Sequence, residues 1–420
     1  MKDVLKLTQR LVPIFVVLVG VYTLLMTAVQ YIPNNMVAEN VAKSAKILKT
    51  EGPRKIIMPG FFGQYRKMDG HTDCLMIDMA IRPDSMTAIE AAMLNVCYCH
   101  IKEDGQPDGY KFADDMFRTA QNDVEGLDQY RYGRCWNGYL VYLKPLLTIM
   151  DFNAIRLLNC IIFIFLIAAC FCAIWKNISH TYAVVFLLCM VYFNFYLAPL
   201  CLQYMQGTIL IFLSTLMVLT SRAINKNIIN TSVFFFVIGS IMAFVDVLTL
   251  PQLTLGVPLL FYYLKNKMNV TLRDFIIICI CWFAGFALTW ASKFIIASLL
   301  TGVNILSDAV HAAQVRTSTS MGTESLSIKS MASALRILIP LFIIMICFIP
   351  YYLKHKSEKI NCKKLIPLFL TFAIVPFWFV VLSNHSFVHI LFTYRAWFLP
   401  TLCVIAYFYL TMKKTEKGNQ

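Results

Sequence analysis

Residues 11–32 read LVPIFVVLVGVYTLLMTAVQYI, an uncharged apolar run that follows a short segment carrying Lys2, Lys6 and Arg10. A helix that spans a membrane needs about 20 such residues. The apolar core of a signal peptide is shorter, about 7–15 residues. No A-x-A cleavage site follows the run. The sequence therefore predicts a retained signal-anchor helix over residues 1–32.

The composition of the whole chain agrees with a membrane protein. Of its 420 residues 59% are apolar and 14% charged, and the mean hydropathy is +0.65. Soluble domains are roughly 45–50% apolar and about 25% charged. The formal net charge is +14, but most Lys and Arg residues flank apolar runs. Membrane topology explains this placement, so nucleic acid is not an expected partner.

Nine further apolar segments follow, which predicts an all-α polytopic membrane protein with about ten transmembrane helices. The segment 252–264 is short, and we expect it to tilt or to form a half-helix against protein. The nine segments are 153–175, 181–200, 205–221, 232–250, 252–264, 274–299, 333–353, 365–383 and 396–412.

Charge predicts the orientation of these helices. The N-terminus and the loops on its side of the membrane hold 17 Lys and Arg residues, whereas the short opposite loops are nearly free of them. The positive-inside rule then places both termini in the cytoplasm, with the protein in the plasma membrane. The predicted domains are the anchor, an extracytoplasmic insert at 33–152, a nine-helix bundle at 153–412 and a cytoplasmic tail at 413–420.

The insert is the acidic part of the chain and is expected to be mostly helical. Residues 31–151 hold 16 of the 23 Asp and Glu residues. Residues 37–51 have a helical pattern with one apolar face, which either lies flat on the membrane or packs on the rest of the insert. Residues 102–128 read as a mobile surface loop, because they lack the ligand spacing of a calcium site.

The motif Asp69-Gly-His-Thr-Asp73 supplies the candidate catalytic carboxylates. We expect a turn at residues 69–71, then a helix to residue 82 capped by Thr72 or Asp73, and a second helix at 85–97. Asp69 and Asp73 are spaced i, i+4 and could share one site. For Asp73, a plain helix cap and a catalytic role are both open.

Other residues of the insert give weaker predictions. Residues 129–145 crowd aromatic side chains around Arg131 and Arg134, which form either an ordinary interfacial belt or a contact for phosphate or sugar. The four cysteines of the insert show no metal-type spacing, so no metal ligand is assigned, although a divalent cation remains a possible cofactor. A disulfide between Cys74 and Cys135 is also open.

Polar residues in apolar segments are costly and therefore candidates for function. Lys293 and Arg156 lie near the outer ends of their helices, where snorkelling explains them. Asp246 is short and anionic, so we expect a buried partner or a substrate hydroxyl. The outer loop at 300–331 contains His311 and Arg316 and could act as a lid.

The last outer loop, residues 384–395, reads NHSFVHILFTYR. It gathers His385, His389, Tyr394 and Arg395 at the outer leaflet, which suits an anionic lipid head group. With the acids of the insert, these cations fit sugar transfer from a polyprenyl-phosphate carrier. A carboxylate would deprotonate the acceptor hydroxyl, and Arg or His would stabilise the leaving phosphate.

The chain resembles the GT-C glycosyltransferases in three features: a long outer loop with the Asp69-to-Asp73 motif, the run YRYGRCWNGYLVYLKP at 130–145, and Phe-Thr-Tyr-Arg at 392–395. The resemblance implies a membrane enzyme that transfers a hexose or pentose from a lipid-linked donor to an envelope glycan, lipid or protein. It also implies a catalytic Asp in the first outer loop and a basic residue for the lipid phosphate.

Two other functions stay open. A transporter or flippase of a lipid-linked saccharide would show related halves, and we find no internal repeat. An acyltransferase would depend on a His base, such as His311, His385 or His389, and be indifferent to the Asp residues.

Overall fold

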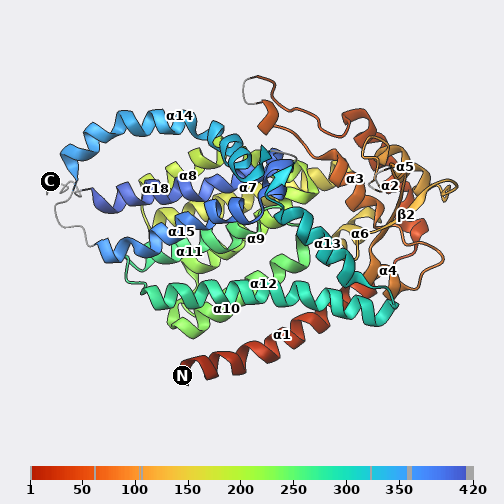
Figure 1. The fold of residues 1–420 in the computed structure, drawn as a ribbon, viewed down its shortest axis with the longest axis horizontal. Coiled ribbons are helices and arrows are strands. Elements are labelled where there is room, and N and C mark those ends of the chain that lie inside the picture. The colour runs from red at the N-terminus through yellow and green to blue at the C-terminus, as the bar shows by residue number, and fades with distance from the viewer. Residues whose placement is uncertain are drawn as a thin grey trace.

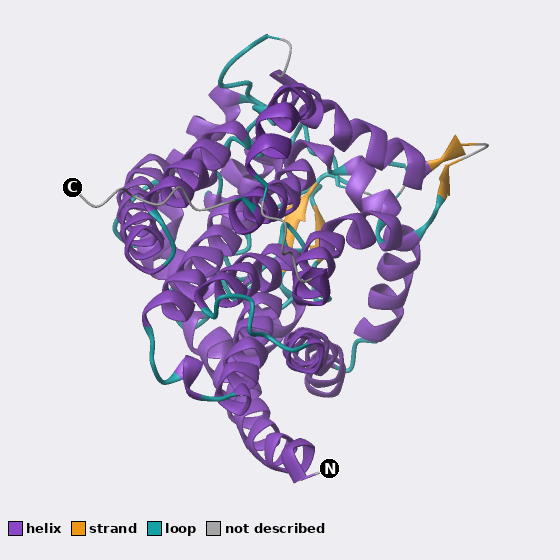
Figure 2. Cartoon of the chain, turned by 90° about the vertical axis from the view of Figure 1, so that its left-hand side faces the viewer, coloured by secondary structure: helices purple, strands orange, loops and turns teal. Residues whose placement is uncertain are grey.

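The fold is almost wholly helical, with two small antiparallel strand pairs (Figures 1 and 2). It is taken from a computed structural model that describes residues 2–60, 63–103, 105, 107–321, 324–356 and 362–412. The expected tail at 413–420 lies outside these residues. The predicted all-α, membrane-type architecture is confirmed.

Eight helical stretches in the described chain are long and apolar enough to cross a membrane. Seven are single helices, and the eighth, Ile390–Thr411, combines α17 (Ile390–Thr393), η4 (Tyr394–Trp397) and α18 (Phe398–Thr411). The seven are α1 (Lys2–Val29), α7 (Phe152–Asn177), α9 (Leu202–Thr220), α10 (Ile228–Val245), α12 (Leu272–Thr301), α14 (Leu326–His355) and α15 (Cys362–Val381).

The other two predicted spans are shorter helices. Segment 181–200 contains α8 (His180–Tyr192), which ends where Asn194 takes a left-handed conformation before η2 (Phe195–Leu200). Segment 252–264 is α11 (Pro251–Lys265), which is buried along almost its whole length against α9, α10 and α15. Because protein rather than lipid surrounds α11, it need not match the thickness of a bilayer.

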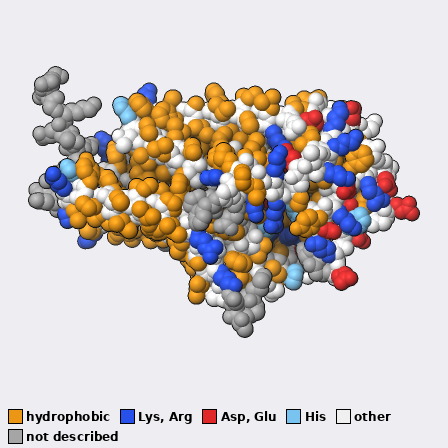
Figure 3. Space-filling model, turned by 90° about the horizontal axis from the view of Figure 1, so that it is seen from above, with side chains coloured by type: hydrophobic (Ala, Val, Ile, Leu, Met, Phe, Trp, Pro, Cys, Tyr) orange, Lys and Arg blue, Asp and Glu red, His pale blue; other side chains and the backbone are white. Residues whose placement is uncertain are grey.

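Residues between α1 and α7 lie together at one end of the molecule, and α18 ends toward the other (Figure 1). Acidic and basic side chains gather at this insert end, whereas apolar side chains cover most of the bundle on the same face (Figure 3). The elements of the insert are α2 (Asn34–Glu51), η1 (Gly63–Tyr65), α3 (Gly70–Asp78), α4 (Ala88–Leu94), β1 (Val96–Cys99), α5 (Phe112–Ala120), β2 (Asp128–Arg131) and α6 (Leu140–Leu147).

Three local predictions for the insert are wrong. Residues 102–128 are not a loop throughout, because α5 packs its apolar face on α2 and α3. The helix expected at 85–97 ends at Leu94, and β1 then pairs with β2 from Val96 opposite Arg131 to Cys99 opposite Asp128. The cap of α3 is Asp69, whose side chain accepts from the Thr72 backbone N–H, and not Thr72 or Asp73.

The helix predicted at 37–51 is confirmed as α2, and it packs inside the insert. Its apolar face, including Val37 and Leu48, is buried against α5, α7 and α3. The apolar core of the insert continues onto Tyr22 and Met26 of α1. The insert is therefore built onto the bundle.

A buried ion pair joins the insert to the bundle. Arg156 of α7 donates two hydrogen bonds to Glu51 of α2, at 2.9 and 2.8 Å, and its Nε donates to the Leu200 carbonyl at 2.8 Å. This paired guanidinium is buried, so snorkelling does not explain it. Cys74 and Cys135 are both free thiols.

Smaller elements complete the outer loops and connections. α13 (Ile305–Thr317) packs against α16 (Ser383–Val388) at the last loop. β3 (Ser320–Met321) pairs with β4 (Glu324–Ser325) before α14. η3 (Ile224–Lys226) connects α9 to α10.

Candidate functional site

Asp69 lies at the seam between the insert and the bundle. As the cap of α3, its two carboxylate oxygens accept from the backbone N–H of Thr72 at 3.3 Å and the Thr72 hydroxyl at 2.9 Å. Its own backbone N–H donates to Cys201 Sγ, at the start of α9. The side chain is buried. The cap thus fixes a carboxylate against the outer end of a bundle helix.

Asp73 is held differently. It is fully buried, and its Oδ1 accepts from the Leu202 backbone N–H at 2.8 Å, in the first turn of α9. Burial raises the pKa of this carboxyl well above its usual range, against the opposing charge of Arg156. A carboxyl so placed anchors α9 to α3. Asp69 and Asp73 share a helix but have separate partners.

Arg395 is the most unusual charge in the described structure. It is 1% exposed and makes no ion pair with a carboxylate among the described residues, and its one polar side-chain neighbour is the Tyr204 hydroxyl. Its guanidinium carbon lies 4.3 Å from the ring centroid of Tyr204 and 5.1 Å from that of Tyr394. Aromatic faces offset only part of the cost of burying such a charge. An unpaired, stacked guanidinium is suited to receive an anion.

Tyr204 of α9 interacts with both Asp69 and Arg395. It lies in the first turn of α9, three residues after Cys201, and is fully buried. The charges of both Asp69 and Arg395 act on its phenol. Its hydroxyl interacts with the Arg395 guanidinium. The structure thus brings Asp69 and Arg395 to one buried phenol.

Tyr394 secures this arrangement. Its hydroxyl donates to the Tyr65 carbonyl at 2.6 Å and accepts from the Asn194 amide at 2.9 Å. Because Tyr65 belongs to η1 of the insert, these bonds tie the last outer loop to the insert beside Arg395. Tyr394, a predicted ligand residue, uses its hydroxyl to position its neighbour.

His385 and His389 form a pair in the last loop, with ring centroids 4.8 Å apart. His385 Nε2 lies 2.9 Å from the Leu248 carbonyl, and its buried Nδ1 has no partner among the described residues. Burial and then the charges of Arg316, Arg54 and His71 lower the pKa of His389 to about 4. The pair therefore lies among cations from other parts of the chain.

Three predicted ligands lie elsewhere. Arg131 is exposed on β2. Arg134 pairs with Asp308 of α13 at 3.3 Å and lies over the Tyr132 ring. Lys293 is fully buried and donates to the Ala92 carbonyl at 3.0 Å, so snorkelling is the wrong explanation for it.

Asp246, the acidic residue singled out in the apolar segments, caps the end of α10. Its Oδ2 accepts from the Thr249 backbone N–H at 2.7 Å, whereas its buried Oδ1 has no partner among the described residues. The Thr249 hydroxyl in turn donates to the Gln203 carbonyl, next to Tyr204. The expected buried partner is thus a backbone turn.

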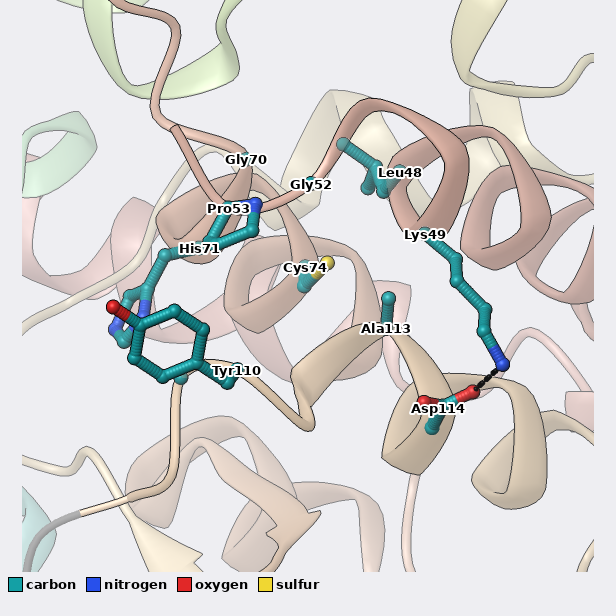
Figure 4. A pocket seen from close by; sticks show the side chains of 11 residues that line it. Leu48, Lys49, Gly52, Pro53, Gly70, His71, Cys74, Tyr110, Ala113 and Asp114 are labelled. Atoms are coloured by element: carbon teal, nitrogen blue, oxygen red, sulfur yellow. Dashed lines mark hydrogen bonds and ion pairs between the residues drawn. The ribbon is translucent and has the colours of Figure 1, made fainter. Parts of the chain in front are cut away.

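A small pocket opens in the insert beside the Asp69 motif. It has a volume of about 60 Å³ between α2, α3 and the segment that enters α5. His71 and Tyr110 lie on one side, and the ion pair of Lys49 with Asp114, at 2.5 Å, lies on the other (Figure 4). The backbone of Gly109 lies so close to the His71 imidazole that a Cβ there would collide with it. Local packing thus fixes the His71 ring.

A long apolar groove runs along α18 of the bundle. It has a volume of about 740 Å³ and follows α18 from Trp397 to Met412. Phe342 and Phe348 of α14 form the opposite wall. Trp397 is two residues from Arg395, and its indole N–H has no partner among the described residues. Trp397 thus connects one end of the groove along the chain to Arg395, which does not itself line the groove.

No group of three or more His, Cys, Asp or Glu side chains in the described part of the chain is placed to hold a metal ion. The possible divalent cation stays a prediction. Sequence reasoning missed Tyr204 and Cys201, which look like ordinary residues of an apolar helix. It also gave no role to Arg54 or His71, although His71 lies inside the quoted motif.

Comparisons with protein-family models, with curated proteins and with solved structures gave no match.

Proposed function

We propose that the protein is a glycosyltransferase that moves a sugar from a polyprenyl-phosphate donor to an acceptor of the cell envelope at the outer membrane face. The observation that carries this proposal is that the first turn of α9 contacts both groups: Cys201 accepts from the Asp69 backbone N–H, and the Tyr204 ring lies 4.3 Å from the Arg395 guanidinium, which has no ion-pair partner among the described residues. Such a pair meets the two charge requirements of the reaction, removal of a proton and stabilisation of a leaving phosphate.

In this reaction the Asp69 carboxylate takes the proton of an acceptor hydroxyl. The hydroxyl oxygen attacks the anomeric carbon as the bond from that carbon to the phosphate oxygen breaks, with inversion. The polyprenyl phosphate leaves with an added negative charge, which Arg395 stabilises. Burial excludes water, so this interaction is stronger than it would be in solvent.

The apolar groove along α18 supports a lipid donor in particular. A polyprenyl chain in it would keep its hydrocarbon among apolar side chains from Trp397 to Met412 and bring its phosphate to Arg395. The proposed orientation, with the insert and the Arg395 end of α18 on the extracytoplasmic side, is supported by the charge distribution of the loops.

Asp69 rather than Asp73 is the proposed base. Among the described residues, both oxygens of Asp69 bond only to Thr72, which is itself part-buried at the seam, whereas Asp73 is enclosed and bonded to the α9 backbone. Asp73 is therefore assigned to positioning, through α9 and Tyr204.

The test compares Asp69→Asn with Asp73→Asn in the full chain in nanodiscs. The readout is release of polyprenyl phosphate from a panel of labelled polyprenyl-phosphate sugars. We expect Asp69→Asn to lower transfer by about 10²–10⁴-fold, the range for loss of a general base, with Asp73→Asn much closer to wild type. Full transfer by Asp69→Asn would remove the proposed base. Movement of intact donor across vesicles without cleavage would favour a transporter.

A further inference from the structure

The first turn of α11 holds a buried amide that the fold does not use. Gln252 is 1% exposed, and neither the oxygen nor the nitrogen of its side-chain amide has a hydrogen-bond partner among the described residues. Most buried polar side chains of folded proteins are paired, and an unpaired one costs stability. The Gln252 amide is therefore a candidate for a group that binds a ligand.

The geometry of α11 directs Gln252 toward α18. The Thr254 hydroxyl accepts from the Trp282 indole N–H at 3.2 Å, so Thr254 faces α12. Two residues correspond to about 200° around an α-helix, so Gln252 lies on the opposite face. Gly256 shares the face of Gln252 one turn further along, and a Cβ there would collide with the Leu399 side chain. Because Leu399 belongs to α18, Gln252 lies on the α18 side of α11.

α9 and α11 pack side by side and run in the same direction. Just before α11, the Thr249 hydroxyl donates to the Gln203 carbonyl in the first turn of α9, at 3.3 Å. Near the other end of both helices, the Lys265 ammonium donates to the Val218 carbonyl at 3.0 Å. The first turn of α11, with Gln252, therefore lies level with the first turn of α9.

Arg395 lies at this level too. Its guanidinium carbon is 4.3 Å from the centroid of the Tyr204 ring, in the first turn of α9. Arg395 precedes Leu399 by four residues, as Gln252 precedes Gly256, so the two polar side chains come from facing sides of neighbouring segments. An amide oxygen within reach of a guanidinium would accept from it. The Gln252 oxygen has no partner among the described residues, so the two groups are farther apart than a hydrogen bond.

A second unpaired group belongs to the same region. His385 Nε2 lies 2.9 Å from the Leu248 carbonyl, in the turn that leads into α11. The Phe392 ring lies 6.1 Å from that of His385 and 5.9 Å from that of Tyr204. A carbonyl only accepts, so Nε2 carries the proton. Burial lowers the pKa of His385 well below its usual range, which leaves Nδ1 as an acceptor without a partner among the described residues.

We propose that Gln252 and His385 bind hydroxyl groups of the transferred sugar, and that this sugar carries no charge. The inference rests on the proposed function and deepens it. A hydroxyl both donates and accepts, so it can pair with either atom of the amide and with the imidazole Nδ1. Neither side chain offers a charge to a uronic acid or an amino sugar, and Arg395 is assigned to the donor phosphate.

The first experiment measures binding without an acceptor. The full chain in nanodiscs is titrated with farnesyl phosphate, alone or carrying glucose, galactose, mannose, arabinose, glucuronic acid or glucosamine, and affinity is read from the rise in the thermal unfolding midpoint. In wild type we expect a neutral sugar, but neither charged one, to raise affinity over farnesyl phosphate by about tenfold or more. Gln252→Met should abolish this increase and leave the affinity for farnesyl phosphate unchanged.

Thr254→Val, on the opposite face of α11, is the matched control and should keep the increase. Gln252→Asn withdraws the amide by one methylene and gives the same reading if Gln252→Met does not fold. The proposal is overturned if both Gln252 variants keep the increase, if they weaken binding of farnesyl phosphate equally with and without sugar, or if no neutral sugar raises affinity in wild type. Preference for a charged sugar would also overturn it, and preference for glucosamine would assign recognition to the Asp246 carboxylate.

The second experiment adds acceptors and follows release of the prenyl phosphate. Sugar-dependent binding that is lost in Gln252→Met, without any release by wild type, would keep the sugar site and remove the transferase. Transfer that requires Asp69 but has the same KM for the donor in Gln252→Met and wild type would remove the sugar site alone. The failure of this inference and the failure of the proposed function are therefore distinguishable.

Discussion

Arg395 stacks on Tyr204 at 4.3 Å with no ion-pair partner among the described residues, whereas Arg156, also buried, is fully paired with Glu51 and the Leu200 carbonyl. A buried ion costs several kcal/mol unless it is compensated. Arg156 is compensated by the fold itself. Arg395 is not, so its retention is better explained by a ligand than by stability.

Replacing Arg395 with Met distinguishes a role in ligand binding from a role in the stability of the fold. We expect Arg395→Met to keep or raise the thermal unfolding midpoint, because it removes a buried charge that has no ion-pair partner among the described residues. Transfer should fall by about 10²–10³-fold, as when one donor to a developing oxyanion is removed. Unfolding in nanodiscs and release of polyprenyl phosphate, measured on the same preparation, check both outcomes.

Arg156→Met is the matched control. It removes the two hydrogen bonds to the part-buried Glu51 and the one to the Leu200 carbonyl, and leaves Glu51 with Lys55 as its remaining partner, so it should lower the thermal unfolding midpoint. If Arg395→Met destabilised the chain to the same degree, Arg395 would be a structural residue and the donor site would be lost.

Filling the groove should act on the donor. Val404 lines the groove on α18, and Val404→Trp places a bulky ring where a polyprenyl chain would lie. We expect a higher KM for long-chain donors, with little change for a donor of one or two isoprene units. Val381→Trp, on the exposed face of α15 outside the groove, is the control. Equal kinetics for both variants would show that the groove holds no donor chain.

Apolar length and charge asymmetry were enough to predict an all-α membrane protein. These two features predicted ten membrane spans, whereas eight helical stretches of the described chain are long enough to cross a membrane. Composition does not reveal that α11 is buried among other helices. Periodicity also failed at α5, whose acidic residues hid a short amphipathic helix. In both cases tertiary burial decided the outcome.

For the candidate site, the sequence singled out Asp69 through the motif from Asp69 to Asp73, and Arg395 and the His pair because they gather in the last loop. It could not identify Tyr204, since a Tyr in an apolar helix is ordinary. Nor could the sequence predict that Asp69 and Asp73 have different partners. Asp73 accepts from the backbone N–H of Leu202, which lies 129 residues further along the chain. Nor could the sequence supply the partners of Lys293 and Arg134, the Ala92 carbonyl and Asp308, which are also distant in sequence.

The stability of the insert should depend on pH through Asp78. Burial raises the pKa of this carboxyl to about 7, against the hydrogen bond it accepts from the Tyr98 backbone N–H. The pKa in the unfolded chain is about 3.9. A raised folded pKa gives stability that is complete below about pH 4 and is lost as the pH rises through about 7.

Asp78→Asn should therefore be more stable than wild type at pH 8, with the advantage shrinking toward pH 4. Thermal unfolding midpoints of both proteins across this range check the slope. Glu90→Gln, at an exposed capping box, is a control without a buried carboxylate. A difference between Asp78→Asn and wild type that stays constant with pH would contradict this assignment.

The last prediction concerns the contact of α10 with α12, which brings two glycines against opposite backbones. A Cβ on Gly239 would collide with the Trp282 carbonyl, and one on Gly285 with the Phe236 carbonyl. Small residues of this kind let membrane helices approach closely. Gly239→Ala and Gly285→Ala should each cost about 1–3 kcal/mol, the usual cost of overpacking. Gly20→Ala in α1, where a Cβ meets open space, is the control. Because backbone atoms cannot move aside as a flexible side chain can, unfolding midpoints equal to that of Gly20→Ala would mean that these helices are further apart than described.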